Sequence, residues 1–131
     1  MRIQVRDYEP DDADGVALLC VELGCASLTD PHVVDRVFCA PGVSAVVAVH
    51  RNEVVGFAQA QGDGLLQSHL SVLAVAPAHR RRGVARRLVQ TVFAATGTLR
   101  MDVVTDSADA FVRTLPHQAM SGYRVHPGTN R

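Results

Sequence analysis

The sequence predicts an α/β domain in which a mixed β-sheet is packed on both faces by helices. Three observations support this fold class. Stretches of alternating apolar and polar residues take turns along the chain with stretches of helical period. Of the 131 residues, 47% are hydrophobic, which is enough to fill one core. Because neither a repeat nor a linker interrupts the pattern, we expect residues 1–131 to form a single domain.

A short strand and a helix come first. Apolar and polar side chains alternate in residues 3–7, as is typical of a strand. From Val16 to Leu23, apolar residues recur at i, i+3, i+4 and i+7, which indicates a helix with one buried face. Asp11 and Asp12 are candidates to cap this helix, and Gly24 is placed to end it.

A second helix and a β-hairpin follow. Asp30–Pro31 combines a capping residue with a proline at the first helical position, which predicts a helix start. This helix should end before Pro41–Gly42. Two runs rich in valine and alanine, residues 44–50 and 54–60, are separated by a three-residue turn and predict the two strands of the hairpin.

The central strand and the most regular helix lie in the middle of the chain. The apolar run 65–76 predicts the strand, and Pro77 closes it because proline cannot donate a hydrogen bond to the ladder. A helical period begins at Val84, and Gly97 is the predicted C-terminal cap. Five apolar residues share one face of this helix: Ala85, Leu88, Val89, Val92 and Phe93.

Three shorter elements complete the prediction. Residues 99–103 alternate as a fifth strand, and residues 107–115 have a helical pattern. Pro116 should end or kink that helix, because proline disfavours helical geometry in the residue before it. Residues 122–125 are predicted as a last short strand.

Charge and composition exclude several classes of protein. Thirteen Lys and Arg balance thirteen Asp and Glu, so the chain lacks the bulk positive charge of non-specific nucleic-acid binding. No apolar stretch is long enough to span a bilayer and no signal peptide is evident, so we expect a cytoplasmic protein without a membrane partner. The three cysteines and six histidines match neither a disulfide framework nor a metal site, and we expect no metal.

A cluster of basic and small residues lies between the central strand and the most regular helix. It consists of Arg80, Arg81, Arg82, Gly83, Val84 and Ala85. A helix N-terminus carries unpaired N–H groups and a partial positive charge, and Gly83 has no Cβ to block a close phosphate. The segment therefore predicts a site for a phosphate-bearing ligand, to which arginine adds charge-assisted donors. The alternatives are a solvated helix face and a nucleic-acid patch, although no aromatic residue is interleaved with the arginines.

The segment Val75–Ala85 resembles the acetyl-CoA signature of the GNAT superfamily of N-acetyltransferases, whose loop reads Arg/Gln-x-x-Gly-x-Gly/Ala. The resemblance implies a mixed, mostly antiparallel sheet of six to seven strands with about four flanking helices and splayed central strands. It implies acetyl-CoA as co-substrate, with the pantetheine arm paired to the backbone of Leu73, Ala74 and Val75. The pyrophosphate would lie on the N–H groups of residues 81–85, and the Val75 N–H would point at the thioester carbonyl, where the oxyanion develops.

The reaction implied by the resemblance is transfer of an acetyl group to a primary amine of a small molecule or peptide. An amine with a pKa near ~10 must lose a proton before attack. His69 occupies the fourth-strand position where many members carry a catalytic Glu, and imidazole suits a base at neutral pH. The alternative is a histidine that only packs within the sheet.

The general acid departs from the family pattern. Many members place a tyrosine on the fourth helix to protonate the thiolate, and neither matching position here, Thr114 or Gln118, holds one. Ser107 and Tyr123 remain as candidate acids, and Ser107 is also a candidate contact to the cofactor. The missing tyrosine and the short segment after Tyr123 leave a second function open, an acyl-CoA-binding regulatory domain without turnover. Because exposed edge strands invite pairing, we expect a homodimer.

Overall fold

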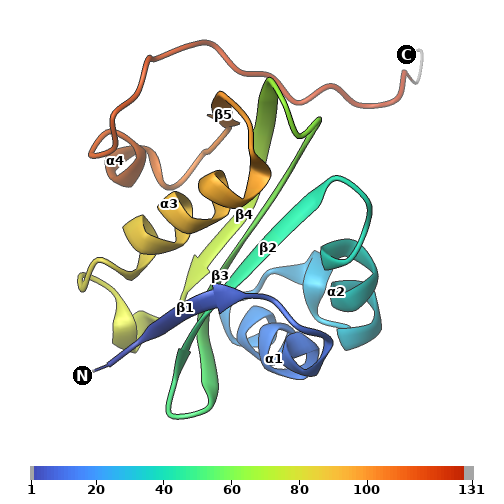
Figure 1. Ribbon diagram of the computed structural model, residues 1–131, viewed down its shortest axis with the longest axis vertical. Coiled ribbons are helices and arrows are strands. Elements are labelled where there is room, and N and C mark those ends of the chain that lie inside the picture. The colour runs from blue at the N-terminus through green and yellow to red at the C-terminus, as the bar shows by residue number, and fades with distance from the viewer. Residues whose placement is uncertain (1, 129–131) are drawn as a thin grey trace.

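The computed structural model describes residues 2–128. Its centre is one five-stranded sheet in the order β1-β2-β3-β4-β5 (Figure 1). The strands are β1 (Gln4–Asp7), β2 (Val43–His50), β3 (Glu53–Gly62), β4 (Gln67–Val75) and β5 (Arg100–Val103). Neighbouring strands are antiparallel except β4 and β5, which are parallel. The sheet is therefore mixed and mostly antiparallel, as predicted.

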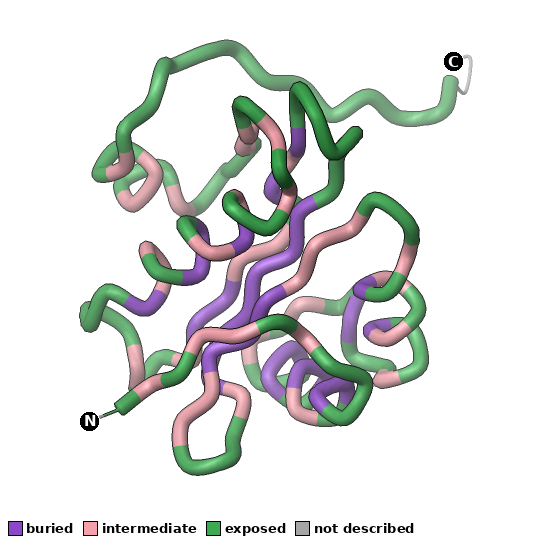
Figure 2. Tube along the Cα trace, viewed as in Figure 1, coloured by how far each residue is buried: buried purple, intermediate pink, exposed green. Residues whose placement is uncertain are grey.

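Helices cover both faces of the sheet (Figure 1). One face carries α1 (Ala13–Leu23) and α2 (Pro31–Phe38), and the other carries α3 (Val84–Thr96) and α4 (Asp109–Val112). Side chains of one strand point alternately to the two faces. In β2, Val47 packs in the core beneath α1 and α2, whereas Val46 and Ala48 pack beneath α3. Figure 2 shows these buried central strands between the half-buried helices.

The predicted sixth strand is wrong, and the described residues form five strands rather than six or seven. Residues 122–125 form irregular chain, in which Tyr123 and Val125 are 83% and 89% exposed. This tail extends away from the edge of the sheet (Figure 1). Alternation over four residues cannot make a strand without a neighbour to receive its backbone hydrogen bonds.

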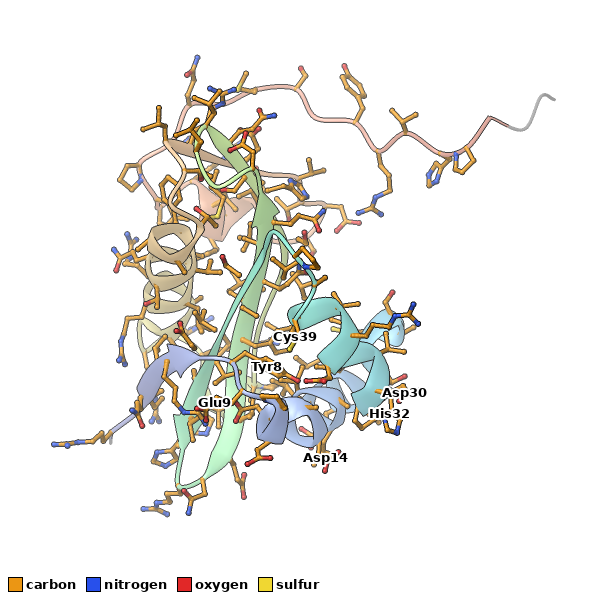
Figure 3. All side chains as sticks on the ribbon, turned by 45° about the vertical axis from the view of Figure 1, so that its right-hand side comes forward. Tyr8, Glu9, Asp14, Asp30, His32 and Cys39 are labelled. Atoms are coloured by element: carbon orange, nitrogen blue, oxygen red, sulfur yellow. The ribbon has the colours of Figure 1, made fainter. Side chains whose placement is uncertain are left out.

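Several predicted element ends are confirmed. α1 ends at Gly24, which has a φ of 76°. The carboxylate of Asp30 accepts a hydrogen bond from the His32 N–H at 2.9 Å and caps α2 (Figure 3). The hairpin turn is one residue shorter than predicted, because Glu53 already belongs to β3 and pairs with His50; Arg51 and Asn52 form the turn with φ values of 51° and 65°.

Two predictions about helices need correction. The helix predicted over residues 107–115 is shorter, since only Asp109–Val112 is helical and Ala108 has no side-chain cap. Asp12 does not cap α1 through its side chain, because its carboxylate bonds backward to Arg6 and to the Glu9 N–H.

None of the described helices has both the length and the apolar character that a membrane crossing requires.

Asp12 and Arg6 form a two-pronged ion pair that joins β1 to the start of α1. Nη1 and Nη2 of Arg6 lie 2.8 and 2.9 Å from the two carboxylate oxygens, and Asp12 is only 8% exposed. Burial alone would raise the pKa of Asp12, but the hydrogen bonds from Arg6 and from the Glu9 N–H outweigh it and hold that pKa below its ordinary value. The pair therefore stabilises the fold above the unfolded pKa of Asp12, and the stabilisation is lost as the pH falls through the folded pKa.

The variant Asp12→Asn is expected to lower the free energy of unfolding at pH 7 by about 2–3 kcal/mol, because Arg6 loses its two-pronged carboxylate partner and keeps only the longer contact to Glu9. Urea denaturation measures this change. The difference from the unsubstituted protein should shrink as the pH falls through the lowered pKa of Asp12. Asp14→Asn, on the exposed side of the same helix, is the matched control. Equal losses in the two variants would show that the ion pair contributes nothing specific.

Candidate functional site

β4 and β5 separate halfway along β4. The parallel pairing joins Gln67–Leu70 to Arg100–Val103 and then stops, while β4 continues to Val75. Beyond Leu70, β4 pairs only with β3 among the described strands. The result is an opening in the sheet, bordered by residues 71–75 on one side and by the chain after β5 on the other.

The backbone of β4 presents two of the three predicted contact residues to this opening. The Ala76 N–H donates to the Val55 carbonyl at 2.7 Å, so the backbone polar groups of Ala76 face β3. Because these groups alternate in direction along an antiparallel strand, those of Ala74 also face β3. Those of Leu73 and Val75 face the opening. Ala74 is therefore placed as a buried core residue and not as a backbone contact for a ligand.

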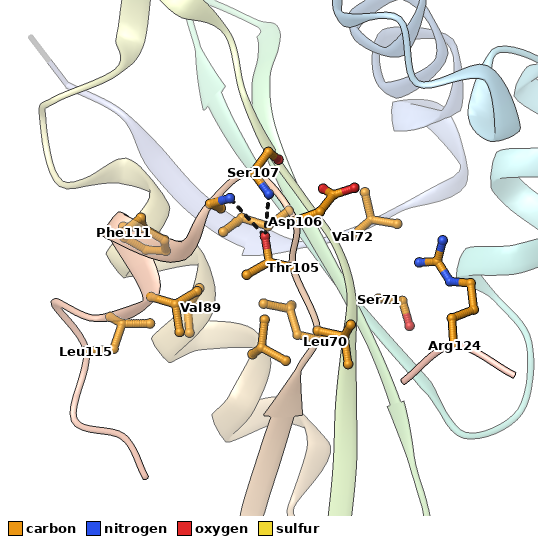
Figure 4. Close-up of a pocket in the computed structure, with 15 residues that line it drawn as sticks. Leu70, Ser71, Val72, Val89, Thr105, Asp106, Ser107, Phe111, Leu115 and Arg124 are labelled. Carbon is orange, nitrogen blue, oxygen red and sulfur yellow. Dashed lines mark hydrogen bonds between the residues drawn. The ribbon is translucent and has the colours of Figure 1, made fainter. Parts of the chain in front are cut away.

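A cavity of about 420 Å³ occupies the opening (Figure 4). Its walls are largely apolar and come from β4, α3 and α4, with Leu70, Val89, Phe111 and Leu115 among them. Thr105, Asp106 and Ser107 follow β5 and line one side. Its lining, a few polar groups among apolar ones, is typical of a small-molecule site.

The turn before α3 has the geometry of an anion site. Arg81 and Gly83 have φ values of 63° and 78°, both in the left-handed region. No side chain caps α3, and its first backbone hydrogen bond runs from the Arg87 N–H to the Gly83 carbonyl at 3.1 Å. The preceding N–H groups of the first turn thus lie free of helical partners. A Cβ built on Gly83 would meet no atom within 4 Å, so the space in front of the turn is open.

The turn is held in place from both sides. Val84 and Leu88 are 2% and 0% exposed and fix α3 against the sheet. Arg80 donates from Nε to the Val75 carbonyl at 2.9 Å, which ties the turn to the end of β4. Arg80 thus anchors the loop through Nε, and the phosphate contact predicted for its guanidinium stays a prediction. The last residue of β4 and the anion site are consequently adjacent.

His69 lies on the opposite face of the sheet from α3. Its neighbour Leu70 packs against α3, so His69 points toward the face of α1 and α2. In the register, Gln61 of β3 and Asp102 of β5 are its cross-strand partners. His69 is half-buried and stands one residue before the strands separate. An imidazole here borders the opening without lining the cavity itself.

The two predicted acids have different positions. Ser107 lines the cavity, and its N–H donates to the Thr105 hydroxyl at 3.3 Å. Tyr123 lies on the exposed tail and does not line the cavity. Thr114, at one of the positions matched to the family's tyrosine, accepts a hydrogen bond from Arg86 at 3.1 Å and donates to the Phe111 carbonyl. No tyrosine is among the described residues that line the cavity.

Most residues that line the cavity, among them Thr105, Asp106, Phe111 and Arg124, were not predicted as site residues from the sequence. Thr105 accepts hydrogen bonds from the N–H groups of Ser107 and Ala108, and a threonine two residues before a serine at a helix start is a detectable signal. Phe111 was detectable as an apolar residue of the predicted helix. Arg124 gave no signal, because the path of the irregular tail does not follow from local sequence.

No clustered ligand set for a metal ion accompanies the cavity. Within residues 2–128, no group of three or more His, Cys, Asp or Glu side chains is placed to hold a metal.

Comparisons with known structures match the fold over nearly the whole chain. An acetyltransferase from Trypanosoma brucei has a TM-score of 0.79 at 16% identity, covering 96% of this chain and 99% of that one. A ribosomal-protein-alanine N-acetyltransferase from Brucella melitensis biovar Abortus has a TM-score of 0.74 at 15% identity, covering 97% and 100%. An aminoglycoside N-acetyltransferase in complex with CoA has a TM-score of 0.72 at 18% identity, covering 96% of each chain.

At these identities the likeness to solved structures concerns the fold alone, and no curated protein matches the sequence. The family comes from the sequence itself. Residues 41–119 match the family model described as "Acetyltransferase (GNAT) domain", which spans more than half of the chain. The matched segment contains the turn before α3, both strands that border the opening, and α4. The chain belongs to the GNAT acetyltransferase family.

Proposed function

We propose that this protein is an acetyl-CoA-dependent N-acetyltransferase that transfers the acetyl group to a primary amine by direct attack on the thioester. One observation carries the proposal. Arg80 ties the uncapped turn at Gly83 to the end of β4, the strand that also lines the cavity through Leu73, so the anion site and the cavity share one strand. An anion site beside a cavity suits a ligand with a diphosphate at one end and a reactive group at the other.

The residues at the site fit acetyl-CoA. Backbone N–H groups of residues 81–85 are proposed to bind the pyrophosphate, with arginine charge beside them. The backbone groups of Leu73 would pair with an amide of the pantetheine arm, and Ser107 would contact it from the other wall. When bound, acetyl-CoA would supply an activated acyl group, and the residues of this chain would hold that group in position.

The chemical step requires a hydrogen-bond donor to the thioester oxygen and a base that accepts the proton of the amine. The Val75 N–H is proposed to donate to the thioester carbonyl oxygen, on which negative charge develops during attack. The amine nitrogen forms a bond to the carbonyl carbon, its proton passes to His69, and the carbon–sulfur bond breaks. Ser107 is the candidate to donate a proton to the departing sulfur. A thiol with a pKa near ~8.5 is a tolerable leaving group, so the reaction does not depend on a tyrosine.

An acyl-cysteine route has less support than direct attack. None of the described cavity residues is a cysteine. Cys20 lies in the core beneath α1 and α2, and burial raises the pKa of its thiol to about 12, with Cys25 adding to the effect. A thiol in that state is a poor nucleophile.

The class of the acceptor amine and the oligomeric state of the protein are both proposals. The similar solved structures include enzymes named for an aminoglycoside and for a ribosomal-protein alanine, which favours a small-molecule or peptide amine here. The homodimer remains a prediction. β5 is a four-residue edge strand in the described structure, and such an edge is open to pairing with a second copy.

The function is tested by following free thiol released from acetyl-CoA in the presence of amines. We expect release to rise well above the acceptor-free rate with at least one of a panel of amino acids, amines, peptides and aminoglycosides. Calorimetry with CoA is measured in parallel. Binding of CoA without thiol release from any amine would favour the alternative, an acyl-CoA-binding regulatory domain. Absence of CoA binding to the folded protein would contradict both functions.

A further inference from the structure

The cavity contains two charged side chains of opposite sign, Asp106 and Arg124. The other thirteen residues that line it are apolar or neutral. Neither charge is neutralised within the described chain, since no ion pair or hydrogen bond joins the Asp106 carboxylate or the Arg124 guanidinium to a protein group. The nitrogen and oxygen atoms of the two groups are also too far apart for an ion pair with each other. Two opposite charges thus stand separately at one opening.

Both groups belong to the side of the sheet that the cofactor is not proposed to occupy. Figure 4 shows Arg124 across β4 from Phe111 and Leu115, with the Asp106 carboxylate directed toward the same side. The anion site at Gly83 belongs to α3, on the other face of the sheet. Arg124 is therefore not placed to bind the cofactor's phosphates. His69 also points to the face on which Arg124 lies.

We propose that the acceptor is a zwitterion, an amine that also carries a carboxylate. Arg124 binds the carboxylate, and Asp106 attracts the ammonium form of the amine before it loses its proton. Guanidinium binds a carboxylate through two parallel hydrogen bonds, which orients the acceptor as well as holding it. A polycationic aminoglycoside would bring a second positive charge toward Arg124 and is disfavoured. The inference rests on the proposed function and names the substrate class of the same site.

The inference is tested with matched pairs of acceptors. Alanine, leucine, phenylalanine, serine and glutamate are each compared with the corresponding amino-acid amide, and kcat/KM is measured by thiol release. We expect at least one acid to exceed its amide by ~10-fold or more. The α-amino group of an amino-acid amide is a weaker base than that of the free amino acid, so a larger fraction of it is deprotonated at a given pH. Amine reactivity alone would therefore favour the amide. Kanamycin, a polycation, should be a poorer acceptor than the best acid.

Three variants test whether Arg124 and Asp106 cause the preference for the acid over its amide. Arg124→Met should lower kcat/KM for the acid at least ~10-fold, mainly through KM, and leave the amide within about 2-fold. Arg124→Lys should retain part of the preference, because lysine keeps the charge without the two-pronged geometry. Asp106→Asn should lower kcat/KM for acid and amide by similar factors. Arg36→Met, which removes the same charge from the exposed side of α2, should change neither.

The failure of this inference differs from failure of the proposed function. Turnover of amines with no acid preferred over its amide overturns the inference alone. Equal losses for acid and amide in Arg124→Met also overturn it, because Arg124 would then act on the fold or on the cofactor. Thiol release with none of the amines overturns the proposed function and this inference together. An acid preference that disappears in Arg124→Met supports it.

Discussion

Gly83→Glu is expected to lower the affinity for acetyl-CoA at least ~100-fold. A side chain at this position projects into the open space in front of the α3 N-terminus, where the pyrophosphate is proposed to bind. The added carboxylate repels the phosphates, and a residue with a Cβ resists the left-handed backbone by roughly 1–2 kcal/mol. Calorimetry with CoA, on protein whose folding is checked by circular dichroism, measures the dissociation constant.

The matched control is Gly64→Glu. Gly64 lies in the turn between β3 and β4, has a φ of 77°, and likewise faces open space. The two variants therefore carry the same backbone strain and the same charge, and differ only in their distance from the anion site. We expect Gly64→Glu to lower the melting temperature about as much as Gly83→Glu and to bind CoA normally. Equal affinities in the two variants would refute the anion site at the start of α3.

His69→Gln is expected to lower kcat by ~100-fold or more while the KM for acetyl-CoA changes little. The glutamine keeps most of the volume and a hydrogen-bonding group but cannot accept a proton. Steady-state thiol release at varied acetyl-CoA concentration measures both constants.

Comparing kcat with stability separates catalysis from packing. A histidine that only packs against Gln61 and Asp102 would give a less stable variant whose folded fraction keeps its kcat. His32→Gln, an exposed histidine on α2, serves as the control and should leave kcat unchanged. An unaltered kcat in His69→Gln would remove His69 from the mechanism and leave water as the base.

Sequence alone predicted those parts of the fold that local chemistry determines. The start of α2 follows from Asp30–Pro31, and the end of α1 follows from the left-handed Gly24. The apolar face of α3 and the turn before it could both be predicted from the sequence. A helical period that directly follows a proline-terminated strand is compatible with few structures other than a strand, a turn and a helix. These features depend on residues that are close together in the chain.

The errors concern features that depend on distant partners. The pattern of residues 122–125 suggests a strand, but no strand lies beside the tail to pair with it. Asp12 looks like a capping residue, but Arg6 on β1 takes its carboxylate instead. The direction of the Ala74 amide depends on which strand lies on each side of β4. The cavity role of Arg124 likewise depends on the course of the tail in space.

The brief pairing of β5 has a consequence for local stability. Among the described residues, the C-terminal part of the chain pairs with the sheet strands only through the four residues of β5 and one neighbour, and it otherwise rests on the packing of Phe111 and Leu115 and on the Arg86–Thr114 hydrogen bonds. Because the β2–β3–β4 portion retains its own ladder without β5, the C-terminal segment can detach in a sub-global opening while the remainder stays folded. Amide protons of Arg100–Val103 should then exchange with solvent sooner than those in the centre of β3. A molecule bridging the two walls of the opening would slow that exchange without touching β5 itself.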